Sequence, residues 1–426
     1  MRPSVLFINR VYPPARGATG RVLQDLARAM ALEGWDVTVL TTGTSSTTED
    51  DKGVQVIRVK APHRPRRALS YLGIGRTLKR AAMKLPAPHL LVTMTDPPML
   101  VTVGAAVAKR KKCRHIHWCQ DLYPDLLPAL RIRFPGLFMG YFKHRATTAM
   151  KSCDKIVVIG RCMAKLLTKK DINPAQITVV PNWPDIELTS PEGQEGFNHA
   201  STPASHDPSV DRASESLNEA EHRPVQEQHK QPPKFRILYA GHLGLAHPVG
   251  TILKAAAAIK NDMDDVEFVF VGDGPEFDKI SEHRKKHHLN NIRLLPYQPL
   301  SRLRFVMESG DVHLISMRGN AAGMLVPSKL YTALAVGRPT LFLGPKNSET
   351  AKVITDYKTG SVISQNDLEG FIEEIRRYRY DENYWFNAHH AAVEASKVFT
   401  PRESLEAWIE RAWGVIEDDL QANRNG

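Results

Sequence analysis

Long apolar runs are absent from this sequence. The longest, at about residues 99–108, contains Thr102 and Gly104 and is far shorter than the ~20 residues that cross a bilayer. The apolar stretch at residues 5–8 is too short for a signal peptide and leads directly into polar residues. We therefore expect a cytoplasmic protein without a membrane-spanning helix. Its 42% hydrophobic and 24% charged residues are typical of a globular chain.

Cysteine is scarce, and its spacing is not that of a zinc site. The four cysteines are Cys113, Cys119, Cys153 and Cys162. None of them forms a C-x-x-C pair, so buried free thiols in a reducing compartment are expected. His115 and His117 alternate on an apparent strand, where two histidines on one face could bind a metal. Structural histidines are the more common outcome, and we predict no metal site.

The G-x-G-x-x-G fingerprint of dinucleotide-binding folds is also missing. The loop after the first predicted strand contains Gly17 and Gly20 at a different spacing. The second predicted strand ends in Thr41 and Thr42, where a nicotinamide-binding fold places an acidic residue. A nicotinamide cofactor is therefore disfavoured. The two glycines still allow a phosphate or a sugar to approach the backbone closely.

Apolar strand-like segments alternate with amphipathic helical ones along most of the chain. This alternation predicts an α/β protein with two doubly wound parallel sheets. We predict an N-terminal domain at 1–188 and a second domain at 235–400, with a final helical segment at 401–426. The intervening 189–234 is rich in Ser, Pro, Glu, Gln and His, which predicts a disordered linker or insertion. Such domains would face each other across a cleft, with ligands at the carboxyl ends of the strands.

Charge is unevenly distributed between the two halves. Residues 1–185 contain 30 Lys and Arg against 12 Asp and Glu, a net charge of +18, and the remainder contains 27 against 34, a net charge of −7. Basic residues interleave with bulky apolar ones at 64–80 and 131–145, a pattern that favours an anionic membrane surface. A solvated basic face over ordinary core helices is the alternative. Nucleic acid is not expected as a partner, because helix-turn-helix and stacking-aromatic patterns are lacking.

The segment 323–339 is the most informative part of the sequence. It predicts a loop, a short buried helix, a stop at Gly337 and then an apolar strand at 340–343. Pro327 suits the first helical position, which places Ser328 and Lys329 in the first turn. Free backbone N–H groups and the helix dipole would favour a phosphate or diphosphate there. A buried helix that begins with a solvated lysine is an equally acceptable interpretation.

Other polar loops also directly follow predicted strands. In the first half, Gln120 and Asp121 follow the strand at 114–119. A carboxylate there could orient a substrate hydroxyl or take its proton, or it could simply cap a helix. In the second half, the segments 241–247, 272–275 and 296–297 follow successive predicted strands. Their shared position at strand ends predicts a crevice the size of a nucleotide.

Taken in order, these motifs resemble the GT-B glycosyltransferases of family 4, in the bacterial exopolysaccharide and O-antigen subgroup with a Val-Pro-Ser-Lys motif. The resemblance covers nearly everything outside 190–234. The motifs are residues 7–42, Thr95-Asp96-Pro97-Pro98, residues 120–125, Pro181-Asn182-Trp183, Gly272-Asp273-Gly274-Pro275 and Val326-Pro327-Ser328-Lys329. The resemblance implies retaining transfer from a nucleotide diphosphate sugar, with a UDP-sugar favoured. A lipid-linked saccharide acceptor at the inner face of the cell membrane is also expected, in cell-surface polysaccharide or lipopolysaccharide synthesis. The net charge of +18 in the first half motivates the membrane part.

Site residues follow from the same resemblance. The family works without a tightly bound metal or cofactor, so protein charge and helix dipoles must stabilise the leaving diphosphate. The implied catalytic residues are Gln120, Asp121 and Lys329. The implied residues for the donor diphosphate and sugar are Gly17, Gly20, Gly241, His242, His247, Gly323, Met324, Ser328 and Lys329. The implied nucleoside-binding residues are Gly272, Pro296, Tyr297, Thr332 and Glu349.

The sequence also departs from the family pattern. Met324 and Thr332 stand where many members have glutamates for the sugar and the ribose, and Glu349 is our substitute for the ribose contact. His242 and His247 stand near the positions of an arginine and a lysine that bind the diphosphate in many members. Two other functions therefore stay open. One is a nucleotide-sugar epimerase on the same scaffold, and the other is a non-catalytic basic binding protein.

Overall fold

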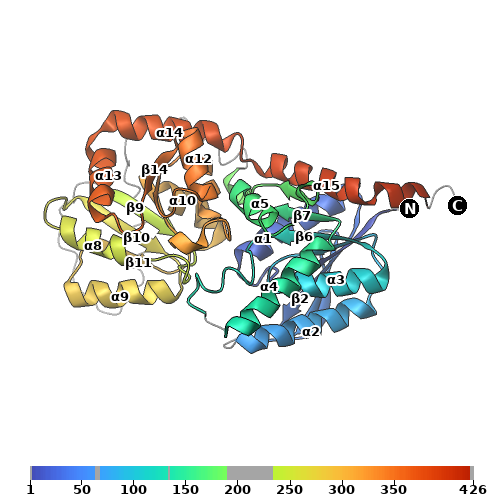
Figure 1. The fold of residues 1–426 in the computed structure, drawn as a ribbon. Helices are drawn as coiled ribbons and strands as arrows, with labels where there is room; N and C mark the ends of the chain where they lie inside the picture. Colours follow the sequence, from blue (N-terminus) through green and yellow to red (C-terminus); the bar gives the residue numbers. More distant parts are fainter. Residues whose placement is uncertain (1, 63–67, 133–134, 190–233, 423–426) are drawn as a thin grey trace, which may run out of the picture. The chain divides into compact units, whose positions relative to one another are not determined.

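The computed structural model describes residues 2–62, 68–132, 135–189 and 234–422. Contacts between residues divide the chain into two compact units. Unit 1 comprises residues 1–183, 323–326 and 401–426, and unit 2 comprises residues 184–322 and 327–400. Each unit is a sheet with helices on both faces (Figure 1). Of the predicted linker, residues 190–233 lie outside the described part of the chain.

Unit 1 is built on a sheet of eight strands in the order β3-β4-β2-β1-β5-β6-β7-β8. The described pairings are parallel except that of β3 with β4, which is antiparallel. The strands are β1 (Ser4–Ile8), β2 (Asp36–Gly43), β3 (Thr47–Asp51), β4 (Val54–Lys60), β5 (Leu90–Thr93), β6 (Arg114–Cys119), β7 (Lys155–Val158) and β8 (Ile177–Val179).

Helices cover both faces of this sheet, because successive strand side chains point to opposite sides. Val5 and Phe7 of β1 face a core shared with α1 and α15, whereas Leu6 and Ile8 face a core shared with α2 and α3. Figure 1 shows α2, α3 and α4 side by side on one face of the sheet. The helices are α1 (Ala18–Leu32), α2 (Ala68–Lys84), α3 (Leu100–Lys111), α4 (Gly136–Lys151), α5 (Arg161–Thr168), α15 (Pro401–Ala422) and the 3-10 helix η1 (Pro174–Gln176).

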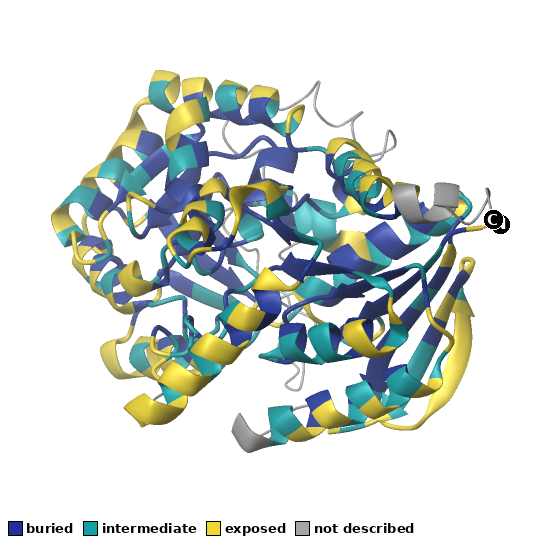
Figure 2. Cartoon of the chain, turned by 45° about the vertical axis from the view of Figure 1, so that its right-hand side comes forward, coloured by how far each residue is buried: buried dark blue, intermediate teal, exposed yellow. Residues whose placement is uncertain are grey.

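Unit 2 is built on six strands in the order β11-β10-β9-β12-β13-β14, and the described pairings are all parallel. Figure 2 shows that the sheet strands of the chain are mostly buried, as expected for parallel sheets between helical layers. The strands are β9 (Phe235–Ala240), β10 (Val266–Val271), β11 (Ile292–Leu295), β12 (Val312–Ser316), β13 (Thr340–Leu343) and β14 (Gly360–Ile363). The helices are α8 (Gly250–Ile259), α9 (Pro275–His287), α10 (Leu303–Glu308), α11 (Lys329–Ala335), α12 (Glu349–Tyr357), α13 (Leu368–Tyr380), α14 (Glu382–Ser396) and the 3-10 helices η2 (Ile186–Leu188), η4 (Leu300–Arg302) and η5 (Gly319–Ala321).

Two details of the predicted elements were wrong. Strand β3 was not predicted, because its residues are polar and largely exposed, and only its antiparallel pairing with β4 defines it. The helix of the segment 323–339 begins at Lys329 rather than at Pro327, with Ser328 as the preceding N-cap residue. Its predicted end is confirmed. Gly337 has a φ of 62°, and its N–H donates to the carbonyl of Leu334 at 2.9 Å.

Helix α15 is held to unit 1 by a cluster of tryptophans. Trp408 is fully buried, with its ring centroid 5.2 Å from that of Trp118 and 6.2 Å from that of Phe7. Trp118 in turn stacks on Trp183 at 5.9 Å. Aromatic rings of this size bury large apolar areas and prefer such tilted or offset arrangements. The cluster therefore joins the final helix to the strand ends of unit 1.

We expect Trp408→Ala to destabilise the protein, because truncating a buried tryptophan typically costs about 3–5 kcal/mol of unfolding free energy. Trp413→Ala is the comparison variant, because Trp413 lies on the same helix with 36% of its surface exposed and contacts only Trp35 among the described tryptophans, at 4.8 Å between ring centroids. Urea unfolding followed by circular dichroism would measure both variants. Equal midpoints for the two variants would contradict the role of the cluster.

Candidate functional site

Three glycines in unit 2 pack closely at the ends of neighbouring strands. Gly241 follows β9 and has a φ of 118°, and Gly272 follows β10 and has a φ of 147°. A Cβ atom on Gly272 would lie 2.2 Å from the carbonyl oxygen of Gly241, and one on Gly274 would lie 2.5 Å from that of Leu243. These loops therefore require glycine, because a side chain would clash and the backbone is left-handed.

Lys329 lies against the first of these glycines, Gly241. A Cβ atom on Gly241 would lie 3.1 Å from its Cε atom. The ammonium of Lys329 donates to the carbonyl oxygen of His242 at 3.3 Å and lies 5.0 Å above the centre of the Tyr239 ring. Both partners are uncharged, and no carboxylate in the described part of the chain forms a salt bridge with it. Burial lowers the pKa of Lys329 to about 8, as expected for a cation without a counter-ion.

The two histidines near Lys329 differ from each other. His242 is exposed, and its Nδ1 atom lies 2.7 Å from Oδ1 of Asp273. His247 places Nδ1 2.6 Å from the carbonyl oxygen of Ser316, so Nδ1 carries the hydrogen and Nε2 can only accept. Burial and the charge of Lys329 lower the pKa of His247 to about 3. His247 is therefore neutral near pH 7, and it does not supply the positive charge of the arginine or lysine expected at such a position.

Three of the expected nucleoside residues follow β11 and β13 of the same sheet. Pro296 and Tyr297 come after β11, next to the β10 end with Gly272. The phenol of the buried Tyr239 has a raised pKa, caused first by burial and then by the nearby Tyr297. Glu349 is buried in the first turn of α12, two strands away from β9.

The residues expected to bind the donor sugar lie in unit 1 and not in unit 2. Gly323 and Met324 belong to unit 1, where the N–H of Leu122 donates to the carbonyl oxygen of Met324 at 2.7 Å. This hydrogen bond places Met324 next to the loop that carries Asp121. Thr332, which was expected at the nucleoside, is partly exposed on α11 in unit 2. Ser328, which was expected at the diphosphate, is partly exposed at the N-cap of that helix.

In unit 1, Gln120 follows β6, and its side chain is bonded within the protein. Its side-chain amide donates to Oδ1 of Asn182 at 2.9 Å and accepts from Nδ2 of Asn182 at 2.7 Å. Both side chains are buried. These bonds fix the orientation of the Gln120 amide, and its catalytic role stays a prediction.

Asp121 has the features of a proton-transfer group. Burial raises the pKa of its carboxyl to about 7, with a further contribution from Asp96. No group in the described part of the chain donates a hydrogen bond to the carboxyl oxygens of Asp121. Asp96 itself accepts two hydrogen bonds from Arg10, at 2.6 and 2.7 Å. Asp121 can therefore hold or release a proton near neutral pH.

Gly17 and Gly20 both lie close to Val11 but differ in exposure. Gly17 is exposed just before α1, and a Cβ atom there would lie 3.0 Å from Cγ1 of Val11. Gly20 is buried, and a Cβ atom there would lie 2.9 Å from Cγ1 and 3.0 Å from the carbonyl oxygen of Val11. Close packing of α1 against the preceding loop thus explains Gly20 without a ligand.

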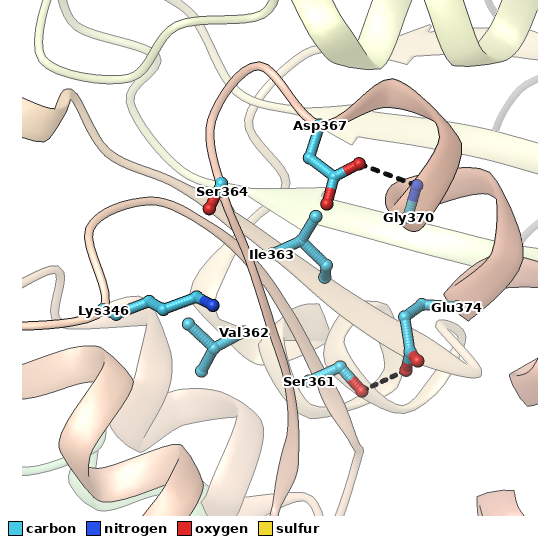
Figure 3. Close-up of a pocket in the computed structure, with 8 residues that line it drawn as sticks. All are labelled: Lys346, Ser361, Val362, Ile363, Ser364, Asp367, Gly370 and Glu374. Atoms are coloured by element: carbon cyan, nitrogen blue, oxygen red, sulfur yellow. Dashed lines mark hydrogen bonds between the residues drawn. The ribbon is translucent and has the colours of Figure 1, made fainter.

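A cavity of unit 2 with a volume of about 360 Å³ lies beside β14 and α13 (Figure 3). Its acidic side chains are already bonded within the protein. Asp367 accepts from the N–H of Gly370 at 2.9 Å as the helix cap, and Glu374 accepts from the hydroxyls of Ser361 and Tyr384. This cavity therefore has few free groups for a ligand compared with the surroundings of Lys329.

Three residues beside these sites were given no role from the sequence. Arg10 and Asp96 lie within the quoted motifs and follow β1 and β5, and Tyr239 lies in β9, with its ring 5.0 Å from the Lys329 ammonium. The position of Arg10 and Asp96 after apolar strands is the signal that could have identified them. Within the described residues, no group of three His, Cys, Asp or Glu side chains could hold a metal ion. Of the helices described, none is both long and apolar enough to cross a membrane.

Comparisons with known proteins agree with this two-unit architecture. Residues 17–183 match the family model of the glycosyl transferase 4-like domain, and residues 221–398 match that of the glycosyl transferases group 1. The chain is 23% identical over 67% of its length to WbjE of Pseudomonas aeruginosa, which is named as a glycosyltransferase. It is 22% identical over 64% of its length to WcaI of Escherichia coli (strain K12), which bears the name of a colanic acid biosynthesis glycosyl transferase. These matches span 66% and 61% of the two relatives.

A solved structure has the same fold. HepE of Anabaena, crystallised with UDP, has a TM-score of 0.63 at 15% identity, over 97% of this chain and 100% of HepE. Parallel-rich α/β sheets in both units are those of the two-domain GT-B fold. Because the two family models together cover most of the chain, it belongs to the GT-B glycosyltransferases, with a glycosyl transferase 4-like domain followed by a group 1 domain.

Proposed function

We propose that the protein is a retaining glycosyltransferase that moves a sugar from a UDP-sugar to a lipid-linked saccharide in cell-surface polysaccharide synthesis. The observation that carries the proposal is the partly buried Lys329, a cation without a described counter-ion that lies against Gly241. HepE, a protein of the same fold, was solved with UDP and with UDP-glucose. The name of WcaI, from colanic acid biosynthesis, supports a polysaccharide product.

In this proposal Lys329 neutralises the leaving diphosphate. The bond between the sugar's anomeric carbon and the β-phosphate oxygen breaks, and its electron pair stays on the diphosphate. A fixed cation stabilises that developing charge, especially where burial has already removed water. The backbone at Gly241 and Gly272 allows the diphosphate to approach closely, and Tyr297 lies beside the base.

Asp121 has the complementary role towards the acceptor. A carboxylate with a pKa of about 7 can orient the acceptor hydroxyl and take its proton as the new bond to the anomeric carbon forms. Met324, next to this loop through its hydrogen bond to Leu122, is the candidate for contact with the sugar. The donor sugar would then be selected by the segment 319–325.

An anionic membrane surface is the proposed working environment. Leu137, Phe138 and Tyr141 on α4 are 93%, 60% and 58% exposed, an unusual set of large apolar side chains in contact with water. Arg76 and Arg80 on α2, in the same helical layer, are also exposed. Basic residues near a membrane each contribute about 1 kcal/mol. Of the basic segments in the sequence, residues 63–67 and 133–134 lie outside the described part.

Lys329→Ala should abolish most of the transfer, because removing one such charge contact typically costs about 10²–10³ in rate. Isothermal titration with UDP-, GDP- and dTDP-sugars should show binding of the UDP-sugar to the unmodified protein and weaker binding to the variant. Lys346→Ala is the control, because Lys346 is exposed in the loop after β13 of the same unit. Wild-type transfer by Lys329→Ala would refute the assignment, and conversion of the donor without an acceptor would favour an epimerase.

The pH dependence of donor binding provides a separate prediction. With a pKa of about 8, Lys329 loses its positive charge as the pH rises through that value. The affinity for UDP should therefore fall between about pH 7 and pH 9, whereas the affinity of Lys329→Ala should stay flat. Titration calorimetry at several pH values would measure this. The same decline in both proteins would assign it to another group.

The membrane proposal predicts binding to vesicles of phosphatidylglycerol and phosphatidylethanolamine that weakens as salt increases. A Leu137→Ser/Phe138→Ser double variant should co-sediment less, because two exposed apolar anchors are lost. Phe386→Ser is the control, since Phe386 is 45% exposed on α14 of unit 2. Failure of the unmodified protein to co-sediment at low salt would end the proposal.

A further inference from the structure

A second, very small cavity lies in unit 1 at the ends of β5 and β6. Its volume is about 10 Å³, and its lining includes polar groups of Thr95, His117, Cys119 and Asp121. This volume corresponds to about one water molecule, and buried waters occupy places that offer two to four polar partners. The remaining walls are mainly apolar and include Leu100 and Met150.

Thr95 brings an unused hydroxyl to this cavity. It is 4% exposed, and its Oγ1 atom has no hydrogen-bond partner among the described residues. Burying a hydroxyl without a partner costs free energy, so such groups are normally satisfied by protein or by ordered water. The Thr95 side chain therefore needs a partner that fits the cavity.

His117 offers an acceptor in a defined tautomer. Its Nδ1 atom lies 3.0 Å from the carbonyl oxygen of Thr93, which can only accept, so Nδ1 carries the hydrogen. Burial, followed by the neighbouring His115, lowers the pKa of His117 to about 3, so the ring is neutral. Nε2 is therefore an unprotonated acceptor, and no described hydrogen bond reaches it.

We propose that this cavity holds one water molecule that links Thr95, His117 and Asp121, which makes Thr95 and His117 positioning residues for the Asp121 carboxyl. The water accepts a hydrogen from the Thr95 hydroxyl and donates one hydrogen to His117 Nε2. Its second hydrogen is then directed at the Asp121 carboxylate. A hydrogen bond to an ionised carboxylate is stronger than one to its neutral form, so the water favours ionisation of Asp121.

Other titratable groups around Asp121 also act on it. Asp96 raises the pKa of Asp121, and the charge of Asp96 is itself paired with Arg10. Tyr123 and Cys119 both have raised pKa values, caused first by burial and then by Asp121, so they stay neutral near pH 7. His115 is also neutral, since burial lowers its pKa to about 4. The water would thus donate to Asp121 among side chains that, apart from the paired Asp96 and Arg10, are neutral near pH 7.

The test compares Thr95→Val with Thr95→Ser. Valine has the shape of threonine without the hydroxyl, and serine keeps the hydroxyl. If Thr95 only fills space, removing its unpaired hydroxyl should be neutral or stabilising. If it holds the water, Thr95→Val should raise the pKa of Asp121 by about one unit, and Thr95→Ser should keep the original pKa.

Carboxyl ¹³C NMR on protein labelled at aspartate would follow the titration, with Asp121→Asn to assign the signal. His117→Asn, which keeps an N–H donor for Thr93 but lacks the Nε2 acceptor, should shift the pKa in the same direction as Thr95→Val. A crystal structure should show the water in the unmodified protein and its loss from Thr95→Val. An empty cavity in the unmodified protein, or an unchanged Asp121 pKa in Thr95→Val, would overturn the proposal.

The role of this water in transfer rests on the proposed function, whereas its presence does not. The NMR titration and the crystal structure need no substrate, so they can succeed even if the protein transfers no sugar. If transfer is observed, the acid limb of its pH profile should move with the Asp121 pKa in Thr95→Val.

Discussion

Parallel strand pairing is the constraint on which both candidate sites depend. When strands run in the same direction, every loop that follows a strand emerges at one edge of the sheet. In unit 2 this edge brings the loops after β9 and β10 into contact, and only glycine allows the approach of 2.2 Å between a Cβ position at Gly272 and the Gly241 carbonyl. In unit 1 the same arrangement joins Thr95 after β5 with Asp121 after β6 around one small cavity.

Burial determines the charge state of the groups at these edges. Desolvation moves each buried group towards its neutral form. The pKa of His117 falls to about 3 and that of His247 to about 3, so both rings act as hydrogen-bonding groups and carry no charge near pH 7. Asp121 and Lys329 move in opposite directions, to about 7 and about 8. Among these four groups, the carboxyl and the lysine are the two whose titration falls close to physiological pH.

Much of the fold could be predicted from local patterns. Apolar runs identified the parallel strands, and Gly337 marked a helix end, because these features depend on neighbours in the sequence. Strand β3 could not be identified, since its residues are polar and only pairing with β4 defines it. The bond between Gln120 and Asn182 joins residues 62 positions apart, so no local pattern could show that the Gln120 amide is occupied. The reason for a glycine at position 20 could not be predicted either, because it lies in the packing of α1 against Val11.

The tryptophans of the chain, which are its fluorescent probes, are unevenly divided between the two units. Of its six tryptophans, Trp385 lies in unit 2, and the rest lie in unit 1 at positions 35, 118, 183, 408 and 413. Intrinsic fluorescence will therefore report mainly on the glycosyl transferase 4-like half. Trp385 stacks on His389 at 4.9 Å, and the guanidinium of Arg338, which follows the C-terminal end of α11, lies 5.7 Å from the centre of its ring. Lys329 begins the same helix at its other end, so emission changes caused by a nucleotide bound at Lys329 should be small. A tryptophan introduced at Tyr297 would give the second half a probe of its own beside the proposed base site.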